Sequence, residues 1–163
     1  MKLLNQLFCL VMWVPASHAA MAAQACPLAG SWTLVAADVI RPDGVREHDY
    51  GDAPQGLMMI DAEGRYTAQI YKSERPLYAS GDKKAGTAAE FEAAALGSST
   101  HFGTLTIDTE THTLTFHITS SAFKNWEGTQ QKRSYELNGD ELSYRVPARP
   151  DGSVPLSVWR RVR

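Results

Sequence analysis

The sequence lacks a marked excess of either charge. It carries 16 Lys and Arg residues against 18 Asp and Glu residues, a formal net charge of −2 at pH 7. A nucleic-acid-binding domain is expected to show a clustered basic excess, and the main basic cluster here is confined to the C-terminal end, at Arg160, Arg161 and Arg163. The motifs G-x-x-x-x-G-K-[ST], H-E-x-x-H and C-x-x-C are absent as well. We therefore predict no nucleic-acid partner, no cofactor and no metal site.

Long hydrophobic runs are also missing. The apolar stretch from Leu3 to Val14 is shorter than the roughly 20 residues that span a bilayer. It follows Lys2 and precedes Pro15 and several small residues, a pattern typical of a secretory signal peptide. We predict that residues 1–25 are a signal peptide, cleaved after Ala19 or Ala25, and that the protein is exported to the periplasm or secreted, with no transmembrane span. An uncleaved N-terminal membrane anchor is the alternative.

Cysteine is scarce. Cys9 lies inside the predicted signal peptide, so only Cys26 remains in the mature chain and no internal disulfide can form. We expect Cys26 to be a free thiol near the N-terminus. Lipid attachment is the alternative, although the preceding Ala23-Gln24-Ala25 matches a lipoprotein signal poorly. The fold must therefore be held by its hydrophobic core.

Short alternating segments bounded by turn residues fill the rest of the chain, which we predict to be a single domain over residues 26–163. Thr87–Leu96 is the one predicted helix, with Thr87 as its cap and Glu90 three residues on. Residues 45–54 are predicted as a loop. Eight segments are predicted as strands, at 32–40, 56–60, 65–71, 101–108, 113–121, 130–137, 141–146 and 156–162. Consecutive antiparallel strands with one apolar face each must close or stack. We therefore predict an all-β fold, an eight-stranded up-and-down barrel with one short inserted helix, whose interior can hold one small ligand.

Alternation with a period of two predicts which side chains point into the barrel. Around the central hairpin, an apolar face opposes a row of threonines. The residues predicted to point inward are His101, Leu105, Ile107, Leu114, Phe116 and Ile118, with Tyr66, Ala68, Ile70, Leu142, Tyr144 and Val146 from other strands. Arg133, Tyr135 and Leu137 also share one face, which makes Arg133 the single charge on the inner side.

Four stretches together resemble the bacterial lipocalin-like domain family, over nearly all of the chain from about Leu28. They are Gly30-Ser31-Trp32, the segment 75–82 (RPLYASGD), the segment 123–129 (FKNWEGT) and Val158-Trp159-Arg160-Arg161-Val162. The resemblance implies a calycin-type barrel with a small-molecule cavity, without indicating which ligand. It also implies that Trp32 packs under Arg161, or alternatively Arg160, and closes one barrel end. The chain departs from typical secreted lipocalins in having no internal disulfide.

Eight residues are predicted to line or rim the cavity: Tyr66, Ile70, His101, Phe116, Trp126, Arg133, Tyr135 and Tyr144. His101 is either a hydrogen-bonded core residue or a ligand contact or general base. Arg133 is either paired with a ligand carboxylate or phosphate, paired with an internal acid, or misplaced by an error in the alternation. Trp126 either rims the cavity mouth or caps the barrel.

No nucleophile, base and orienting residue can be recognised together. We therefore favour a non-enzymatic barrel that binds a small apolar or amphipathic molecule. One alternative is an isomerase or cyclase in which His101 acts as acid and base and Arg133 orients an oxyanion. The other is a structural or interaction domain with a filled barrel.

Overall fold

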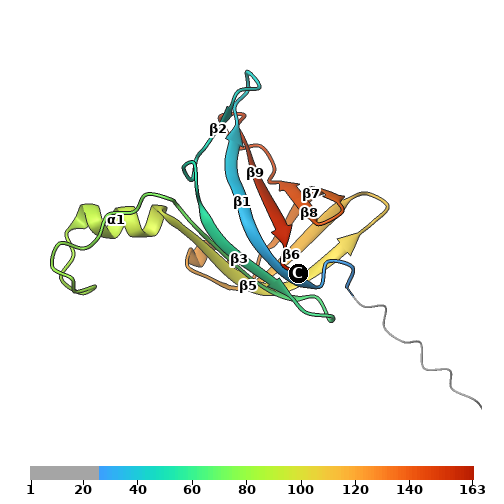
Figure 1. Ribbon diagram of the computed structural model, residues 1–163, viewed down its shortest axis with the longest axis horizontal. Coiled ribbons are helices and arrows are strands. Elements are labelled where there is room, and N and C mark those ends of the chain that lie inside the picture. The colour runs from blue at the N-terminus through green and yellow to red at the C-terminus, as the bar shows by residue number, and fades with distance from the viewer. Residues whose placement is uncertain (1–25) are drawn as a thin grey trace, which may run out of the picture.

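The computed structural model describes residues 26–163, so the predicted signal peptide and its cleavage sites lie outside the described residues. Eight antiparallel strands form a closed barrel, because the last strand pairs with the first. The predicted fold class is confirmed (Figure 1). The strands are β1 (Gly30–Ile40), β3 (Gln55–Ile60), β4 (Arg65–Tyr71), β5 (Ser98–Asp108), β6 (Thr113–Ser121), β7 (Gln130–Asn138), β8 (Glu141–Arg145) and β9 (Val154–Arg161).

The two ends of the barrel differ in their connections. Three tight turns, at 61–64, 109–112 and 139–140, join strands at one end. His112 adopts a positive φ of 50° in one of them, which histidine tolerates better than most residues. The longer connections, at 41–54, 72–97, 122–129 and 146–153, all lie at the other end. Because binding sites usually form on long loops, we expect a ligand-binding site at this second end.

The prediction of residues 45–54 as a loop was wrong in part, because they contain a short strand, β2 (Arg46–Glu47). A bulge between Leu34 and Ala36 bends β1, whose pairing with β3 covers only its first residues, Gly30 to Thr33. The far end of β1 would therefore have an unpaired edge. Strand β2 pairs with Val39 and Ile40 at that edge and satisfies its backbone groups.

The predicted inward face forms the core. Buried apolar side chains from all eight barrel strands pack in one cluster with Leu28; among them are Trp32, Met58, Tyr66, Leu105, Leu114, Phe116, Tyr135, Leu142, Tyr144 and Trp159. Four of the predicted inward residues are less buried than expected, and two of them, Ile70 and Val146, are half-buried at the end with the long connections. Leu137 is 39% exposed and Ile107 is only half-buried. Both lie close to the tight turns, where the barrel ends and water reaches the strand.

Helix α1 (Ala88–Leu96) forms where predicted, with Thr87 and Glu90 making the reciprocal hydrogen bonds of a capping box. It projects away from the barrel (Figure 1), and none of its residues is buried. Leu96, at its end, is among the most exposed apolar residues. Within residues 26–163, no helix is long and apolar enough to cross a membrane.

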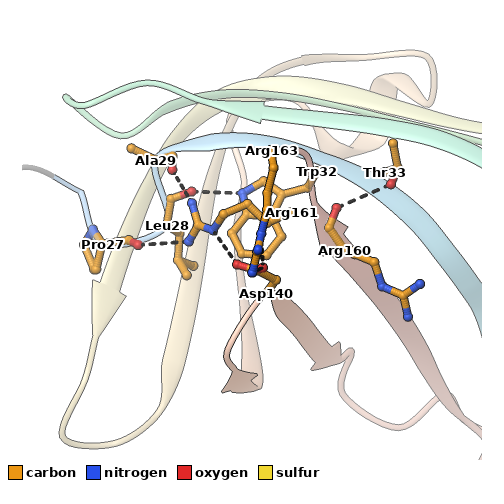
Figure 2. A network of polar contacts seen from close by, with 9 residues as sticks. All are labelled: Pro27, Leu28, Ala29, Trp32, Thr33, Asp140, Arg160, Arg161 and Arg163. Atoms are coloured by element: carbon orange, nitrogen blue, oxygen red, sulfur yellow. Dashed lines mark hydrogen bonds and ion pairs between the residues drawn. The ribbon is translucent and has the colours of Figure 1, made fainter.

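The end with the tight turns is closed by Trp32, which is fully buried. Its indole Nε1 donates a hydrogen bond to the carbonyl oxygen of Leu28 at 3.0 Å. The guanidinium of Arg161 lies 4.1 Å from the centroid of the Trp32 ring (Figure 2). It also donates to the carbonyl oxygen of Ala29 at 2.5 Å. The neighbouring Arg160 points elsewhere, toward Glu141, so Arg161 is the arginine that covers this tryptophan.

Glycine is required where the chain enters β1. Gly30 has a φ of +133°, which L-residues with a side chain rarely adopt, and a Cβ there would lie 3.0 Å from Nη1 of Arg161. The Gly-x-Trp sequence therefore serves the closure of this end: the glycine makes room for the arginine that stacks on the tryptophan.

Candidate ligand-binding cavity

A cavity of about 210 Å³ lies at the opposite end from Trp32. Its walls come from the ends of β1, β4, β5, β7 and β9, and from the long connections around them. Apolar groups include Ile70, Trp126 and Leu156, and the polar groups His101 and Arg133 lie among them. Because the fold brings four long connections to this end, segments far apart in the sequence converge on one small space.

The eight predicted ligand-binding residues fall into three groups. Ile70, His101, Trp126 and Arg133 line the cavity. Tyr66, Phe116 and Tyr144 lie beneath it in the core, where they contact His101 or Arg133. Tyr135 is outside it: its ring packs against His112, at a tight turn of the closed end, with 5.8 Å between the centroids.

Arg133 is buried, with 7% of its surface exposed, on an aromatic floor. Its guanidinium carbon lies 4.3 Å from the centroid of Phe116 and 5.0 Å from that of Tyr144. One Nη donates to Oε1 of Gln131 at 2.8 Å, whereas its Nε is buried without a hydrogen-bond partner. Within residues 26–163, no carboxylate lies within 4.0 Å of this guanidinium. The internal acid partner considered from the sequence is therefore not found among the described residues, and the strand alternation that placed Arg133 inside was correct.

His101 is held next to this arginine as a neutral group. Its Nδ1 lies 2.9 Å from the hydroxyl of Tyr66, so one of these two groups donates a hydrogen bond to the other. Burial, and then the charge of Arg133, lower the pKa of His101 from 6.5 to about 3. Burial likewise raises the pKa of the Tyr66 hydroxyl well above its usual value. At neutral pH both side chains are therefore uncharged.

Trp126 belongs to a short 3₁₀ helix, η1 (Lys124–Trp126), in the connection between β6 and β7. It is half-buried, and its ring meets the imidazole of His101 edge to face, with 6.0 Å between the centroids. The ring of Phe123, which is largely exposed, packs edge to face against that of Trp126, with 5.5 Å between the centroids. Trp126 thus forms part of the cavity wall and is also partly open to solvent.

The chain is similar to known proteins over nearly all of its described residues. A family model described as a lipocalin-like domain matches residues 29–162. The chain belongs to the lipocalin-like domain family. Lipocalin-like barrels generally bind small hydrophobic ligands. A crystal structure of a lipocalin-like protein from Bacteroides uniformis is similar, with 16% sequence identity, a TM-score of 0.43, and coverage of 83% of this chain and 98% of that one. No curated protein matches the sequence.

Sequence reasoning missed a buried acid in the cavity wall of this lipocalin-like domain. The side chain of Asp38 is fully buried. Its two oxygens meet Nε of Arg46 at 2.5 Å and Nδ1 of His48 at 3.0 Å. A charged residue inside the otherwise apolar Ala36-Ala37-Asp38-Val39-Ile40 was the available sign, since such a charge needs partners.

Further polar residues at the cavity were also missed. Asp49 and Arg149 both line it, and their carboxylate and guanidinium lie 3.4 Å apart. Tyr50 follows in the chain, and burial raises the pKa of its hydroxyl. These residues come from two different connections, and only the folded barrel brings them together.

Proposed function

We propose that this lipocalin-like domain binds a small apolar or amphipathic molecule in the cavity at the open end of the barrel and does not catalyse its conversion. The observation that carries the proposal is the cavity itself, which combines apolar walls with a few polar groups, the usual composition of a ligand site. Its volume of about 210 Å³ is below the roughly 300–1,000 Å³ of drug-sized sites. The ligand is therefore small. An open space of this size also speaks against a filled, purely structural barrel.

The state of the polar groups supports binding over catalysis. A general base works best with a pKa near the operating pH, whereas burial keeps that of His101 at about 3. The two carboxylates of the wall, Asp38 and Asp49, are each already paired with an arginine. Both carboxylates thus have a counter-charge already, and His101 is not poised to exchange a proton near neutral pH, as the acid and base of an isomerase or cyclase would be.

Binding is tested by titration calorimetry with octan-1-ol, a neutral apolar probe, together with native mass spectrometry of the purified protein. We expect saturable binding of octan-1-ol or a co-purified small molecule. Ser99→Phe places a large ring at a cavity-lining position of β5 and is expected to abolish the binding. Thr104→Phe, at an exposed position of the same strand, is the control and should bind as the wild type does. Absence of any bound or co-purified molecule in the wild type overturns the proposal.

We also propose export of the protein, supported by the sequence of residues 1–25. Cell fractionation followed by mass spectrometry of the mature N-terminus tests it. A chain beginning after Ala19 or Ala25 in the exported fraction is expected, and a full-length chain in the cytoplasm overturns the proposal. The same mass spectrum shows whether the thiol of Cys26 carries a lipid.

A further inference from the structure

We infer that the ligand of this cavity is a monoanion, a small molecule with one carboxylate-type head that binds Arg133 and an apolar body that lies toward Ile70 and Trp126. The inference rests on the proposed function and specifies its ligand class. Three features of the cavity carry it: the unpaired donor of Arg133, the one-sided packing of its guanidinium, and the charges of the surrounding wall.

The guanidinium of Arg133 has unused hydrogen-bonding capacity. Guanidinium carries five N–H donors, and Gln131 is the only acceptor that Arg133 meets in residues 26–163, while its Nε is buried without any partner. A buried donor left unpaired is costly, and a buried charge more so. A bound oxyanion supplies acceptors and a counter-charge together, with the two-oxygen geometry that fits the arginine fork.

The aromatic rings cover only one side of this guanidinium. The centroids of Phe116 and Tyr144 are 5.6 Å apart. Their distances from the guanidinium carbon, 4.3 Å and 5.0 Å, add up to far more than this separation, so the two rings cannot lie on opposite sides of it. They form a floor, and Arg133 also lines the cavity. The side of the guanidinium away from the rings is therefore available to a ligand.

Among residues 26–163, the charges around the cavity leave the guanidinium of Arg133 without a counter-charge. Asp38 forms an ion pair with Arg46 and a hydrogen-bond contact with Nδ1 of His48, and Asp49 is paired with Arg149. His101, whose pKa is lowered by burial and by the charge of Arg133, contributes no charge. The wall thus matches a ligand with a single negative charge. A dianion such as a phosphate monoester has a second charge that no free cation in this wall matches.

The remaining wall fits an apolar body. Ile70 and Trp126 share the cavity with Arg133, and Val146, Pro155 and Leu156 add further apolar surface. A carboxylate at Arg133 therefore places the rest of the molecule against aliphatic and aromatic side chains. Short-chain or medium-chain carboxylic acids, and small aromatic ones, have this form.

The test compares two probes of similar size in titration calorimetry, octanoate and octan-1-ol, at pH 7.5. In the wild type we expect octanoate to bind about tenfold to 100-fold more tightly, the range for a hydrogen bond to a charged group. In Arg133→Met, this preference should disappear while octan-1-ol still binds. Arg160→Met, which removes an exposed arginine of β9, is the matched control and should keep the preference.

The outcomes separate this inference from the proposed function. Equal affinity of the wild type for both probes overturns the monoanion inference and leaves the proposed function intact, whereas binding of neither probe overturns both. A preference that survives in Arg133→Met overturns the assignment to Arg133. If Arg133→Met does not fold, as judged by circular dichroism, Arg133→Lys keeps the charge and loses the fork. The preference should then fall at least several-fold, and an unchanged preference contradicts two-oxygen binding by the guanidinium.

Discussion

The closed end of the barrel provides a quantitative test, the replacement of Arg161 by methionine. Methionine keeps an unbranched apolar chain over Trp32 and removes the charge and its donors. The stacking of the guanidinium at 4.1 Å from the ring contributes about 0.5–2 kcal/mol. The charged hydrogen bond to the carbonyl oxygen of Ala29 contributes about 1.5–3 kcal/mol in a buried setting. Because a quarter of the side chain is exposed, both values fall toward the lower part of these ranges. We expect a loss of about 2–3 kcal/mol in the free energy of unfolding.

Urea unfolding followed by tryptophan fluorescence measures this loss. With a slope of about 1–3 kcal/mol per M, the transition midpoint should fall by about 0.7–3 M. Arg160→Met is the matched control, since Arg160 is the adjacent residue, largely exposed, and paired with Glu141 at 3.6 Å. Exposed ion pairs contribute about 0–1 kcal/mol, so the control should change little. Equal midpoints for the two variants would refute the conclusion that Arg161 closes this end. Binding of octan-1-ol should be unaffected in both variants, because the cavity lies at the other end.

Three other substitutions test separate parts of the fold. Unfolded His101 takes up a proton near pH 6.5 and folded His101 only near pH 3, so the free energy of unfolding should fall by up to about 1.4 kcal/mol for each pH unit below 6.5. His101→Gln should remove this contribution, so that its urea midpoint falls less between pH 7 and pH 5 than that of the wild type. Asp38→Asn should lower the free energy of unfolding by less than the roughly 3–5 kcal/mol that is lost when a fully buried ion pair is broken, because Arg46 is half-exposed. The loss should still be clearly larger than that caused by Asp43→Asn, at an exposed position, in the same urea assay. Thr87→Ala should weaken α1 by about 1 kcal/mol, seen as faster amide exchange in the helix, with an unchanged midpoint for the barrel because no residue of α1 is buried.

Alternation along the strands was sufficient to predict the barrel and its inner face. It placed His101 and Arg133 inside, and both are buried there. Alternation fixes the face on which a side chain lies, but not its height along the barrel axis. Tyr135 shares a face with Arg133 but lies nearer the closed end, so it packs against His112 instead of lining the cavity. Height depends on the register between strands, which a single sequence does not reveal.

The acidic residues of the cavity were missed for a different reason. The bulge between Leu34 and Ala36 shifts the alternation of β1, and Asp38 follows this bulge. Its partners, Arg46 and His48, lie in a segment predicted as a loop. The contact between Asp49 and Arg149 joins positions 100 residues apart. A contact across this separation arises from tertiary structure and leaves no local pattern, whereas the charge of Asp38 inside an apolar run was a local sign.

An arginine lies on aromatic rings toward each end of the barrel, and the two arginines differ in how many partners the protein supplies for their charge and donors. Arg161 covers Trp32 and also meets the backbone oxygen of Ala29 and, at 4.0 Å, the carboxylate of Asp140. Its charge and donors are matched by the protein itself. Arg133 is more deeply buried than Arg161, and among residues 26–163 only the amide of Gln131 accepts a hydrogen bond from it. A fold that depended on Arg133 for stability alone would be better served by an apolar residue of similar size. A charge at this position is explained if a ligand supplies the counter-charge and the missing hydrogen-bond acceptors.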